Sequence, residues 1–421
     1  MTTKGTEERD YFTDPSILKD PYEYFEEMRF KGPVQQIRDR DLVLVTGFEE
    51  SLEVLKNTKD FSSVVTTGGP VVPLPFEPAG DDISEQLEAN RSRIPGHDLL
   101  VAYDDAHHSA SRALLNRLFV PSRMKANEEF MWGFADKLVK DAVAKGKCEL
   151  ISEIAAPYVT LVVADLLGVP EDDRESFRKV IDAAPPPGSM VDGQTTFSPL
   201  EYMAGFFVRY IEDRRANPRE DVLTELATAK FPDGSSPDVM ELVRLATFLF
   251  GAGQDTSAKL IGNSMRFIVE TPGLQKKLRE DRSLIAPFIE EVLRLEGSTK
   301  ATFRLARRKS RIGDMEIPAG KKVVIGLAAA NRDPRRWEDP KEFKFDRPKI
   351  KEHIAFGRGA HVCVGAALAR TEVRLILDRF LEHTTEIGIS EAEHGPPGSR
   401  RLDYEPSYVI RGLAKMHLEL K

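Results

Sequence analysis

The segment from Phe356 to Arg370, FGRGAHVCVGAALAR, constrains this chain more than any other part of its sequence. Three glycines surround its cysteine, Cys363, and an amphipathic run that predicts a helix, AALARTEVRLILDRFLEH, follows at once. Glycine lets a backbone turn sharply and approach a flat partner closely. A cysteine at a helix N-terminus has its thiolate stabilised by the helix dipole and by free N–H groups. The segment therefore predicts a thiolate held beside a flat ligand, and the alternative is a buried structural cysteine.

Such a thiolate suits an axial ligand of haem iron, because it donates electron density that favours O–O cleavage. The segment resembles the haem-binding signature of the cytochrome P-450 monooxygenases, Phe-Gly-x-Gly-x-His-x-Cys-x-Gly followed by a helix that carries Leu-Ala-Arg. The matching residues are Phe356, Gly357, Gly359, His361, Cys363, Gly365, Leu368, Ala369 and Arg370. The resemblance implies that Cys363 is the axial ligand of haem b (iron protoporphyrin IX). It also implies a mainly α fold with a small β-rich lobe (α+β), in which the haem is buried between a long central helix and the helix after Cys363.

Three further segments occur in the order that this family would require. In the first, Glu291 and Arg294 are three residues apart and share one helix face. Taken alone, such a pair is typical of an ordinary surface ion pair. The resemblance implies a structural role instead, in which the pair holds the fold beneath the haem together with Arg347.

The second segment is a long apolar stretch, LATFLFGAGQDTSAKLIG, with a helix start predicted at Ser236, a capping residue that precedes a proline. In its middle, Ala252 and Gly253 are followed by Asp255 and Thr256, where a helix interior favours stronger helix formers. Spacing alone leaves open a weak point with a chance surface acid. The resemblance implies that the two small residues leave room over the haem and that Asp255 and Thr256 deliver protons to dioxygen.

The third segment places His108 and Arg112 four residues apart, on one face of a predicted helix. An ordinary solvated helix face is the alternative reading. The resemblance implies that both bind a haem propionate, as do Arg304 and His361 on other segments. Arginine suits a carboxylate because its planar fork makes two charge-assisted hydrogen bonds.

The composition of the 421 residues, 41% hydrophobic with a net charge of −8, indicates a globular, mildly acidic chain. The resemblance implies a flexible tail over residues 1–13 and a single domain over residues 14–421. The opening MTTKGTEERDYF has no apolar run, so we expect neither a signal peptide nor a membrane anchor. The expected protein is a cytoplasmic, bacterial-type monomer that binds neither nucleic acid nor membrane.

The sequence contains no G-x-G-x-x-G that opens a helix after a strand, and no appended flavin or iron–sulfur module is recognisable. Electrons would therefore come from a separate ferredoxin and its NAD(P)H-dependent reductase. Basic residues near the cysteine loop predict a cationic docking face for an acidic ferredoxin, with a solvated mixed-charge surface as the alternative. These residues are Arg117, Arg358, Arg370 and Arg374.

The resemblance also implies a substrate pocket, to which the region from Pro185 to Phe207 would contribute. Its remaining residues are Val72, Leu74, Phe76, Phe248, Thr299, Lys300, Ala301, Thr302 and Val409. Most are apolar, as expected for a hydrophobic small molecule such as a terpenoid, steroid, fatty acid or aromatic compound. We expect Lys300 to extend to solvent. If Lys300, Arg91 or Arg93 entered the pocket instead, an acidic substrate would be favoured.

The predicted function is a haem-thiolate monooxygenase that inserts one oxygen atom from O2 into a hydrophobic substrate. A peroxide-driven peroxygenase and a non-catalytic haem carrier or gas sensor are the alternatives. The pair Asp255 and Thr256 argues against both, because neither function needs an acid and an alcohol for proton delivery.

Overall fold

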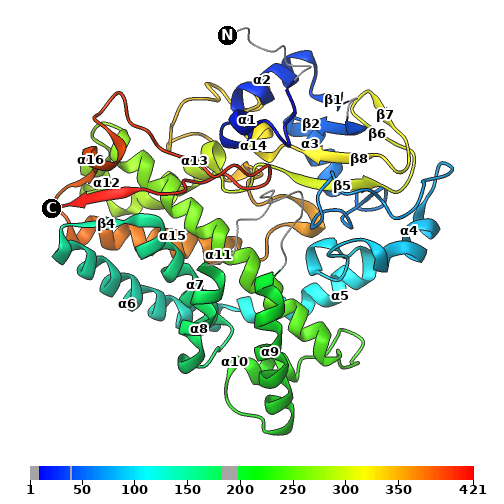
Figure 1. Cartoon of the computed structure of the whole chain (residues 1–421), viewed down its shortest axis with the longest axis horizontal. Helices are drawn as coiled ribbons and strands as arrows, with labels where there is room; N and C mark the ends of the chain where they lie inside the picture. Colours follow the sequence, from blue (N-terminus) through cyan, green and yellow to red (C-terminus); the bar gives the residue numbers. More distant parts are fainter. Residues whose placement is uncertain (1–8, 38–39, 183–197) are drawn as a thin grey trace.

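The computed structural model describes residues 9–37, 40–182 and 198–421. A large helical part lies beside a smaller β-rich part (Figure 1). The helices are α1 (Pro15–Lys19), α2 (Tyr22–Lys31), α3 (Phe48–Lys56), α4 (Ser84–Asn90), α5 (Asp105–Asn116), α6 (Pro121–Lys145), α7 (Ala156–Leu166), α8 (Glu171–Asp182), α9 (Ser198–Ala216), α10 (Val222–Ala227), α11 (Val239–Glu270), α12 (Leu274–Glu280), α13 (Ile285–Glu296), α14 (Leu327–Ala330), α15 (Ala366–His383) and α16 (Glu391–His394). The strands are β1 (Val34–Ile37), β2 (Leu42–Val45), β3 (Phe61–Ser62), β4 (Lys147–Glu149), β5 (Thr302–Ala306), β6 (Ser310–Ile312), β7 (Met315–Ile317), β8 (Lys322–Ile325), β9 (Ile387–Ile389) and β10 (His417–Leu420). The predicted α+β class is confirmed.

A five-stranded sheet with the order β1-β2-β8-β5-β3 forms the centre of the β-rich part. Its strand β2 is apolar throughout and fully buried, which is typical of a strand covered on both faces. Because side chains alternate along a strand, Leu42 and Leu44 enter one hydrophobic cluster and Val43 and Val45 enter another. The neighbouring strand β5 carries Arg304, so the sheet fixes one of the predicted site residues.

The packed part of the chain begins before the predicted boundary at residue 14. Tyr11 and Phe12 are each only 3% exposed, and both belong to the hydrophobic cluster beneath the sheet. The Tyr11 hydroxyl donates a hydrogen bond of 2.7 Å to the carbonyl oxygen of Tyr408. The prediction of a flexible tail up to residue 13 is therefore wrong for these two residues, since burial of their rings anchors them to the core.

Helix α11 is the predicted long helix, and it crosses the helical part of the molecule (Figure 1). The predicted cap at Ser236 is wrong, because the Asp238 side chain caps the helix by accepting a hydrogen bond from the backbone N–H of Glu241 at 2.6 Å. The carbonyl of Pro237 lies outside the helix and accepts a hydrogen bond from Arg215 at 2.7 Å. The cap of the helix is therefore Asp238, two residues after the predicted cap at Ser236.

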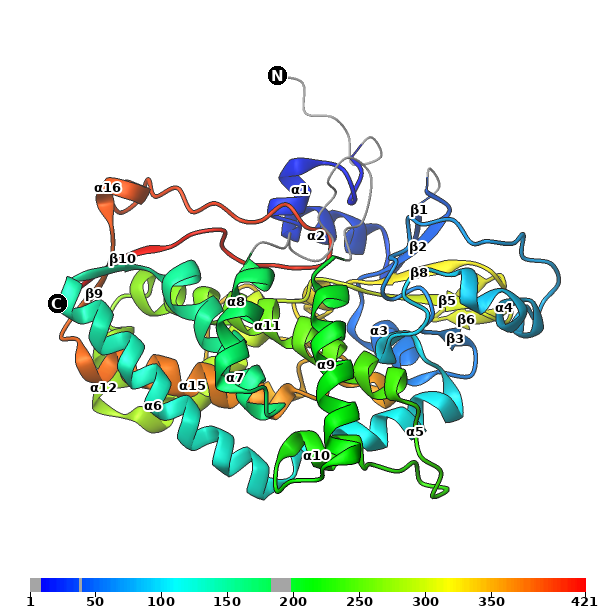
Figure 2. The ribbon, with the colours of Figure 1, turned by 60° about the horizontal axis from the view of Figure 1, so that its bottom comes forward.

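Helix α15 has the bounds that the amphipathic run predicts, and it packs against α6 and α11 (Figure 2). One large hydrophobic cluster joins these helices with α7 and α13. Within the described ranges, no helix is long and apolar enough to cross a membrane. The packing of α15 on α11 brings the cysteine loop and the centre of the long helix into one region.

Candidate active site

The cysteine loop is shaped by glycines and by a hydrogen bond that closes it. Gly359 has a φ of +75°, and a Cβ there would lie 2.5 Å from the carbonyl oxygen of Leu55 in α3, so no larger residue fits. The backbone N–H of Cys363 donates to the carbonyl of Phe356 at 2.9 Å, and Gly365 occupies the N-cap of α15. Local backbone chemistry thus presents the sulfur at the start of a helix.

The sulfur of Cys363 is accessible although protein surrounds it. Burial raises the pKa of the thiol, while a hydrogen bond from the backbone N–H of Gly365 and the positive charge of Arg112 lower it. Desolvation therefore opposes ionisation of the Cys363 thiol, and the Gly365 N–H and Arg112 favour it. A bound metal ion would favour the thiolate further.

Four basic side chains gather from three parts of the fold. The rings of His108 in α5 and His361 in the cysteine loop lie 4.0 Å apart, and Arg112 and Arg304 act electrostatically on both rings. Burial lowers the pKa of Arg304 to about 10, and burial with the two arginines and His108 lowers that of His361 to about 2. Neither arginine forms an ion pair with a carboxylate among the described residues. Such a cluster is chemically suited to an anion with carboxylate groups.

The structure also separates His108 from its neighbour. His107 is exposed and stacks on Tyr103 with 3.9 Å between the ring centroids, whereas His108 is buried beside His361. Sequence spacing placed His108 with Arg112, and the two lie on the same helix face here. Only the buried histidine joins the basic cluster.

The centre of α11 is its accessible part. Ala252 is exposed, whereas Phe250 and Ser257 on either side are 0% and 3% exposed. The Thr256 hydroxyl donates to the carbonyl of Ala252 at 2.9 Å, and the hydroxyl of Ser298 donates to the carbonyl of Thr256 at 2.6 Å. The middle of the helix is therefore accessible at the small residue Ala252, and the half-buried alcohol Thr256 lies one helical turn later.

Asp255 is the acid of this stretch. Burial raises the pKa of its carboxyl to about 6, although the nearby ammonium group of Lys259 lowers it. Its Oδ2 atom is buried and has no hydrogen-bond partner among the described residues. A carboxyl with this pKa can accept and release a proton near neutral pH. Gly253, two residues earlier, lies against α7, where a Cβ would be 3.4 Å from Val163.

The predicted trio of Glu291, Arg294 and Arg347 is brought together in the protein core. Arg294 donates two hydrogen bonds to Glu291 at 2.7 and 2.8 Å, and both side chains are fully buried. Arg347 donates to Glu291 at 3.2 Å, and Arg294 also donates to the carbonyls of Asn331 and Pro340. The ion pair therefore joins α13 to the segment that leads into the cysteine loop.

The predicted pocket residues divide between two hydrophobic clusters. Phe248 packs against the large helical cluster, whereas Leu74, Phe76 and Val409 pack against the cluster beneath the sheet. Ala301 is buried in the second cluster, and Thr302 begins β5. Thr299 forms a β-bridge with Ile410, and the carbonyl of Val72 accepts a hydrogen bond from Lys322. The predicted pocket region from Pro185 to Phe207 lies mostly outside the described residues.

Lys300 does not extend to solvent, so that prediction is wrong. Its side chain is 0% exposed, and Nζ donates a hydrogen bond of 2.6 Å to the carbonyl of Leu18 in α1. Burial lowers the pKa of Lys300 to about 7. Arg91 is bound by Glu88 and Asp104, and Arg93 donates to Asn90. These side chains bond to other parts of the protein, which removes the argument for an acidic substrate.

Two of the four arginines predicted to form a docking face are neutralised. Arg370 makes a bidentate ion pair with Glu290, at 2.6 and 2.9 Å, and Arg374 pairs with Glu128. Arg358 donates only to backbone carbonyls at 3.3 Å, and Arg117 donates to the carbonyl of Lys230. Among the described residues, only these last two of the four lack a carboxylate partner.

Several polar residues near the site were not predicted from the sequence. Glu290 lies directly before Glu291 and binds both Arg370 and His353. Glu372 on α15 is buried, and burial raises its pKa to about 7. Lys259, one helical turn after Asp255, has a spacing that would have identified it, whereas its partner Glu405 is 146 residues away along the chain.

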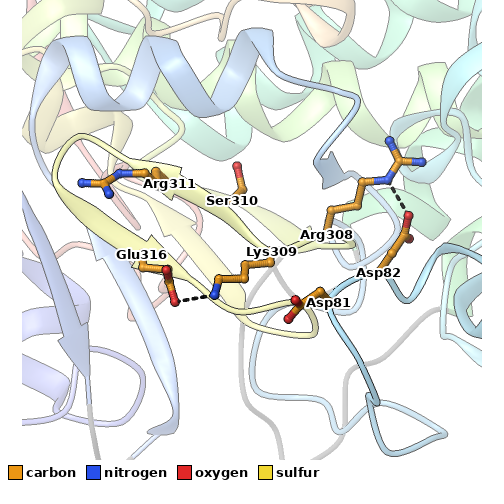
Figure 3. Close-up of a pocket in the computed structure, with 7 residues that line it drawn as sticks. All are labelled: Asp81, Asp82, Arg308, Lys309, Ser310, Arg311 and Glu316. Atoms are coloured by element: carbon orange, nitrogen blue, oxygen red, sulfur yellow. Dashed lines mark hydrogen bonds and ion pairs between the residues drawn. The ribbon is translucent and has the colours of Figure 1, made fainter.

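A shallow surface depression lies beside the β6–β7 hairpin, away from these residues (Figure 3). Ion pairs of Arg308 with Asp82 at 2.7 Å and of Lys309 with Glu316 at 3.1 Å neutralise much of its charge. The lining residues are Asp81, Asp82, Arg308, Lys309, Ser310, Arg311 and Glu316. This polar lining does not match the apolar pocket predicted for the substrate.

Comparison with known proteins gives a consistent result. The family model described as Cytochrome P450 matches residues 194–385. The chain is 31% identical over 420 residues to cytochrome P450 144 of Mycobacterium tuberculosis, and the match covers 97% of this chain and 91% of that protein.

Two solved structures extend the comparison. The substrate-free form of CYP150A6 from Mycobacterium marinum has 48% sequence identity and a TM-score of 0.93, with 99% of each chain covered. CYP109E1 from Bacillus megaterium in complex with corticosterone has 26% identity and a TM-score of 0.79, with 96% of this chain and 99% of that chain covered. The similarity therefore extends over the whole fold.

Proposed function

Because this chain belongs to the cytochrome P450 family of haem-thiolate monooxygenases, we propose that it hydroxylates a hydrophobic small molecule at a haem held by Cys363. The observation that carries this proposal is the donor set around the cysteine loop. One accessible sulfur lies in the same region as four basic side chains that have no carboxylate partner among the described residues.

The donor set fits haem b by its chemistry. A haem-thiolate centre takes one cysteine thiolate as its axial ligand, and the two propionates of haem b need cationic or hydrogen-bonding groups at their edge. Cys363 is the proposed axial ligand, and His108, Arg112, Arg304 and His361 are the proposed propionate-binding residues. Phe356, Gly357 and Gly365 shape the loop that presents the sulfur. Glu291, Arg294 and Arg347 are proposed to have a structural role, since they join α13 to the segment that precedes this loop.

When bound, haem supplies the activation of dioxygen, and the protein supplies space, protons and exclusion of water. Ala252 is small and exposed, so it leaves room beside the centre of α11 for a substrate and dioxygen, whereas Gly253 lets α11 pack closely against α7. Asp255 exchanges a proton near neutral pH because burial raises its pKa to about 6. The Thr256 hydroxyl is the proposed relay, since it can turn from its backbone acceptors and donate into the accessible space.

The proposed substrate is apolar, and a steroid is the first class to test. The pocket residues predicted from the sequence are mostly apolar, and Lys300 makes its hydrogen bond to the backbone of α1. The similarity to a protein solved with corticosterone supports the same choice. Electrons are proposed to come from a ferredoxin and its reductase.

An absorption titration of the purified ferric protein tests this proposal. Steroids, terpenoids, fatty acids and aromatic acids would be added in turn while the Soret band is recorded. We expect neutral apolar compounds, steroids among them, to shift the band to shorter wavelength as they displace water. Shifts with acidic compounds alone would contradict an apolar pocket, and a protein without a haem spectrum would contradict the whole proposal.

A further inference from the structure

The ammonium group of Lys259 lies between two carboxylates at the centre of α11. Its Nζ is 3.9 Å from Oδ1 of Asp255, one helical turn earlier. On its other side it forms an ion pair with Glu405 in the C-terminal segment and donates to the carbonyl of Leu413 at 3.2 Å. The Lys259 side chain is only 4% exposed, so its charge is shielded from water and acts mainly on these partners.

The C-terminal segment is built to hold Lys259 on the Glu405 side. A Cβ at Gly412 would lie within 2.3 to 2.5 Å of three carbons of the Lys259 side chain, so the lysine stem passes directly over this glycine. The backbone N–H of Glu405 donates to the carbonyl of Gly412 at 3.1 Å, which closes the turn around the stem. The preference of Lys259 for Glu405 therefore follows from packing as well as from charge.

Asp255 and Glu405 share one cation, which lies closer to Glu405 than to Asp255. Each acid keeps one buried oxygen, Oδ2 and Oε2 respectively, without a hydrogen-bond partner among the described residues. Lys259 and Glu405 are the charged side chains that act on Asp255 within the described part of the chain. Burial raises the pKa of Asp255, Lys259 lowers it and Glu405 raises it further. The balance between the two acids thus decides how easily Asp255 carries a proton.

We propose that Glu405 is a positioning residue, which holds Lys259 away from Asp255 and so keeps the Asp255 carboxyl able to take up and release a proton near neutral pH. This inference rests on the proposed function, in which Asp255 supplies protons. It adds a residue of the C-terminal segment that acts on Asp255 through Lys259. If Glu405 were removed, Lys259 would turn to Asp255 and stabilise its anion.

The test uses the full-length haem-loaded protein and infrared difference spectroscopy against pH. Protonated carboxyl groups give a C=O stretching band, and the band of Asp255 is the one that Asp255→Asn removes. Glu372→Gln identifies the band of the other buried acid of raised pKa in this region. The variants are Glu405→Gln, which frees the lysine, and Lys259→Gln, which removes the charge and keeps a donor for Leu413.

The two variants should move the Asp255 midpoint in opposite directions. We expect Glu405→Gln to lower it and Lys259→Gln to raise it, each by about one pH unit. The matched control is Lys140→Gln, which removes the lysine of an Asp-x-x-x-Lys pair in α6, where Lys140 lies 2.8 Å from Asp136. This control should leave the midpoint in place.

A Glu405→Gln midpoint that stays the same or rises would overturn the inference, as would shifts of both variants in one direction. Glu405→Gln is nearly isosteric, so the direction of its midpoint shift tests the inference even if Lys259→Gln does not fold. The pH profile of product formed per electron should move in the same directions. The proposed function has a separate readout, the thiolate spectrum of the haem, so an unmoved midpoint with an intact spectrum rejects the positioning role alone.

Discussion

At the scale of single residues, the site depends on groups whose protons and charges are controlled by close neighbours. The Thr256 hydroxyl is satisfied by the backbone of its own helix, while Ser298 ties the Thr256 carbonyl to the turn before β5. The backbone thus holds the hydroxyl in position, through hydrogen bonds to backbone carbonyls of α11. A group in this state can relay a proton with little rearrangement.

Replacing Thr256 with alanine should uncouple electron consumption from product formation. The relay is lost, so we expect product per NAD(P)H to fall several-fold, by about 1 kcal/mol or more at 1.4 kcal/mol per tenfold, while hydrogen peroxide rises. Product and peroxide are measured together in the reconstituted system. Thr256→Ser keeps a hydroxyl and should retain most of the coupling. Unchanged coupling in the alanine variant would remove Thr256 from the mechanism.

His108 and His107 form a matched pair for testing the basic cluster. His108→Ala removes a buried group beside His361, so we expect haem to transfer to apomyoglobin about tenfold faster or more, in line with a loss of about 1.5 to 3 kcal/mol for one hydrogen bond to a charged group. His107→Ala changes an exposed ring and should leave the transfer rate unchanged. Equal rates for the two variants would show that His108 does not hold the haem.

At the scale of secondary-structure elements, buried ion pairs connect α13, α15 and the cysteine loop. Glu290 in the middle of α13 binds His353 at 3.0 Å and Arg370 of α15 at 2.6 and 2.9 Å. The guanidinium of Arg370 also lies 4.7 Å from the ring of Phe356. A single carboxylate thus positions the helix after the cysteine and the residue that opens its loop.

The Glu290 carboxylate should make the free energy of unfolding depend on pH in the acidic range. Burial alone would raise the pKa of Glu290, but hydrogen bonds from His353 and Arg370 lower it from 4.5 to about 2. Because its pKa is lower in the folded protein, ionised Glu290 stabilises the fold at pH values above about 4.5, the pKa of an ordinary glutamate. This stabilisation is lost as the pH falls from about 4.5 towards 2. The full contribution is on the order of 3 kcal/mol, at about 1.4 kcal/mol per pKa unit.

Urea unfolding at a series of acidic pH values measures this effect. Glu290→Gln should be less stable than the parent near neutral pH, and the difference should shrink as the pH is lowered through this range. Glu393→Gln, which changes an exposed residue of α16, is the control and should follow the parent curve. A constant difference at all pH values would mean that the Glu290 charge contributes nothing.

The elements themselves were largely predictable from local patterns. The run after Cys363 predicted α15 because its apolar period is helical and glycine precedes it, and the apolar stretch predicted α11. The start of α11 was missed because two capping residues, Ser236 and Asp238, compete locally, and the tertiary contact of Pro237 with Arg215 decides between them. Glu290 was missed since its partners come from two distant segments.

At the level of the whole molecule, the proposed function requires electrons from a separate protein, for which we propose docking near the cysteine loop. Arg370 and Arg374 are neutralised by Glu290 and Glu128, so the predicted docking face is reduced to Arg117 and Arg358. With a net charge of −8, the molecule as a whole would repel an acidic ferredoxin. Local positive charge therefore has to guide the encounter.

Reversing the charge at Arg358 should lower ferredoxin-driven turnover about tenfold at low ionic strength. The effect should shrink near physiological salt, because the Debye length falls to about 8 Å. Arg311→Glu, on the β6–β7 hairpin, is the matched control and should behave as the parent. Equal turnover of both variants at low salt would exclude docking at Arg358.

The molecule also shows where prediction from sequence ends. Contacts within one helical turn or one loop, such as Glu291 with Arg294, follow from spacing. The pairing of Lys259 with Glu405 and the burial of Lys300 against α1 depend on segments far apart in the chain. No local pattern contains that information, since only the folded core brings these segments together.

The central claim is that Cys363 is the thiolate ligand of haem in this protein. The absorption spectrum of the reduced, carbon monoxide-bound form tests it most directly, on the parent and on two cysteine variants. We expect the long-wavelength Soret band of thiolate ligation for the parent and for Cys148→Ser, whose thiol is buried elsewhere, and its loss in Cys363→Ser. A Cys363→Ser protein that keeps this band, or a parent that lacks it, would contradict the account.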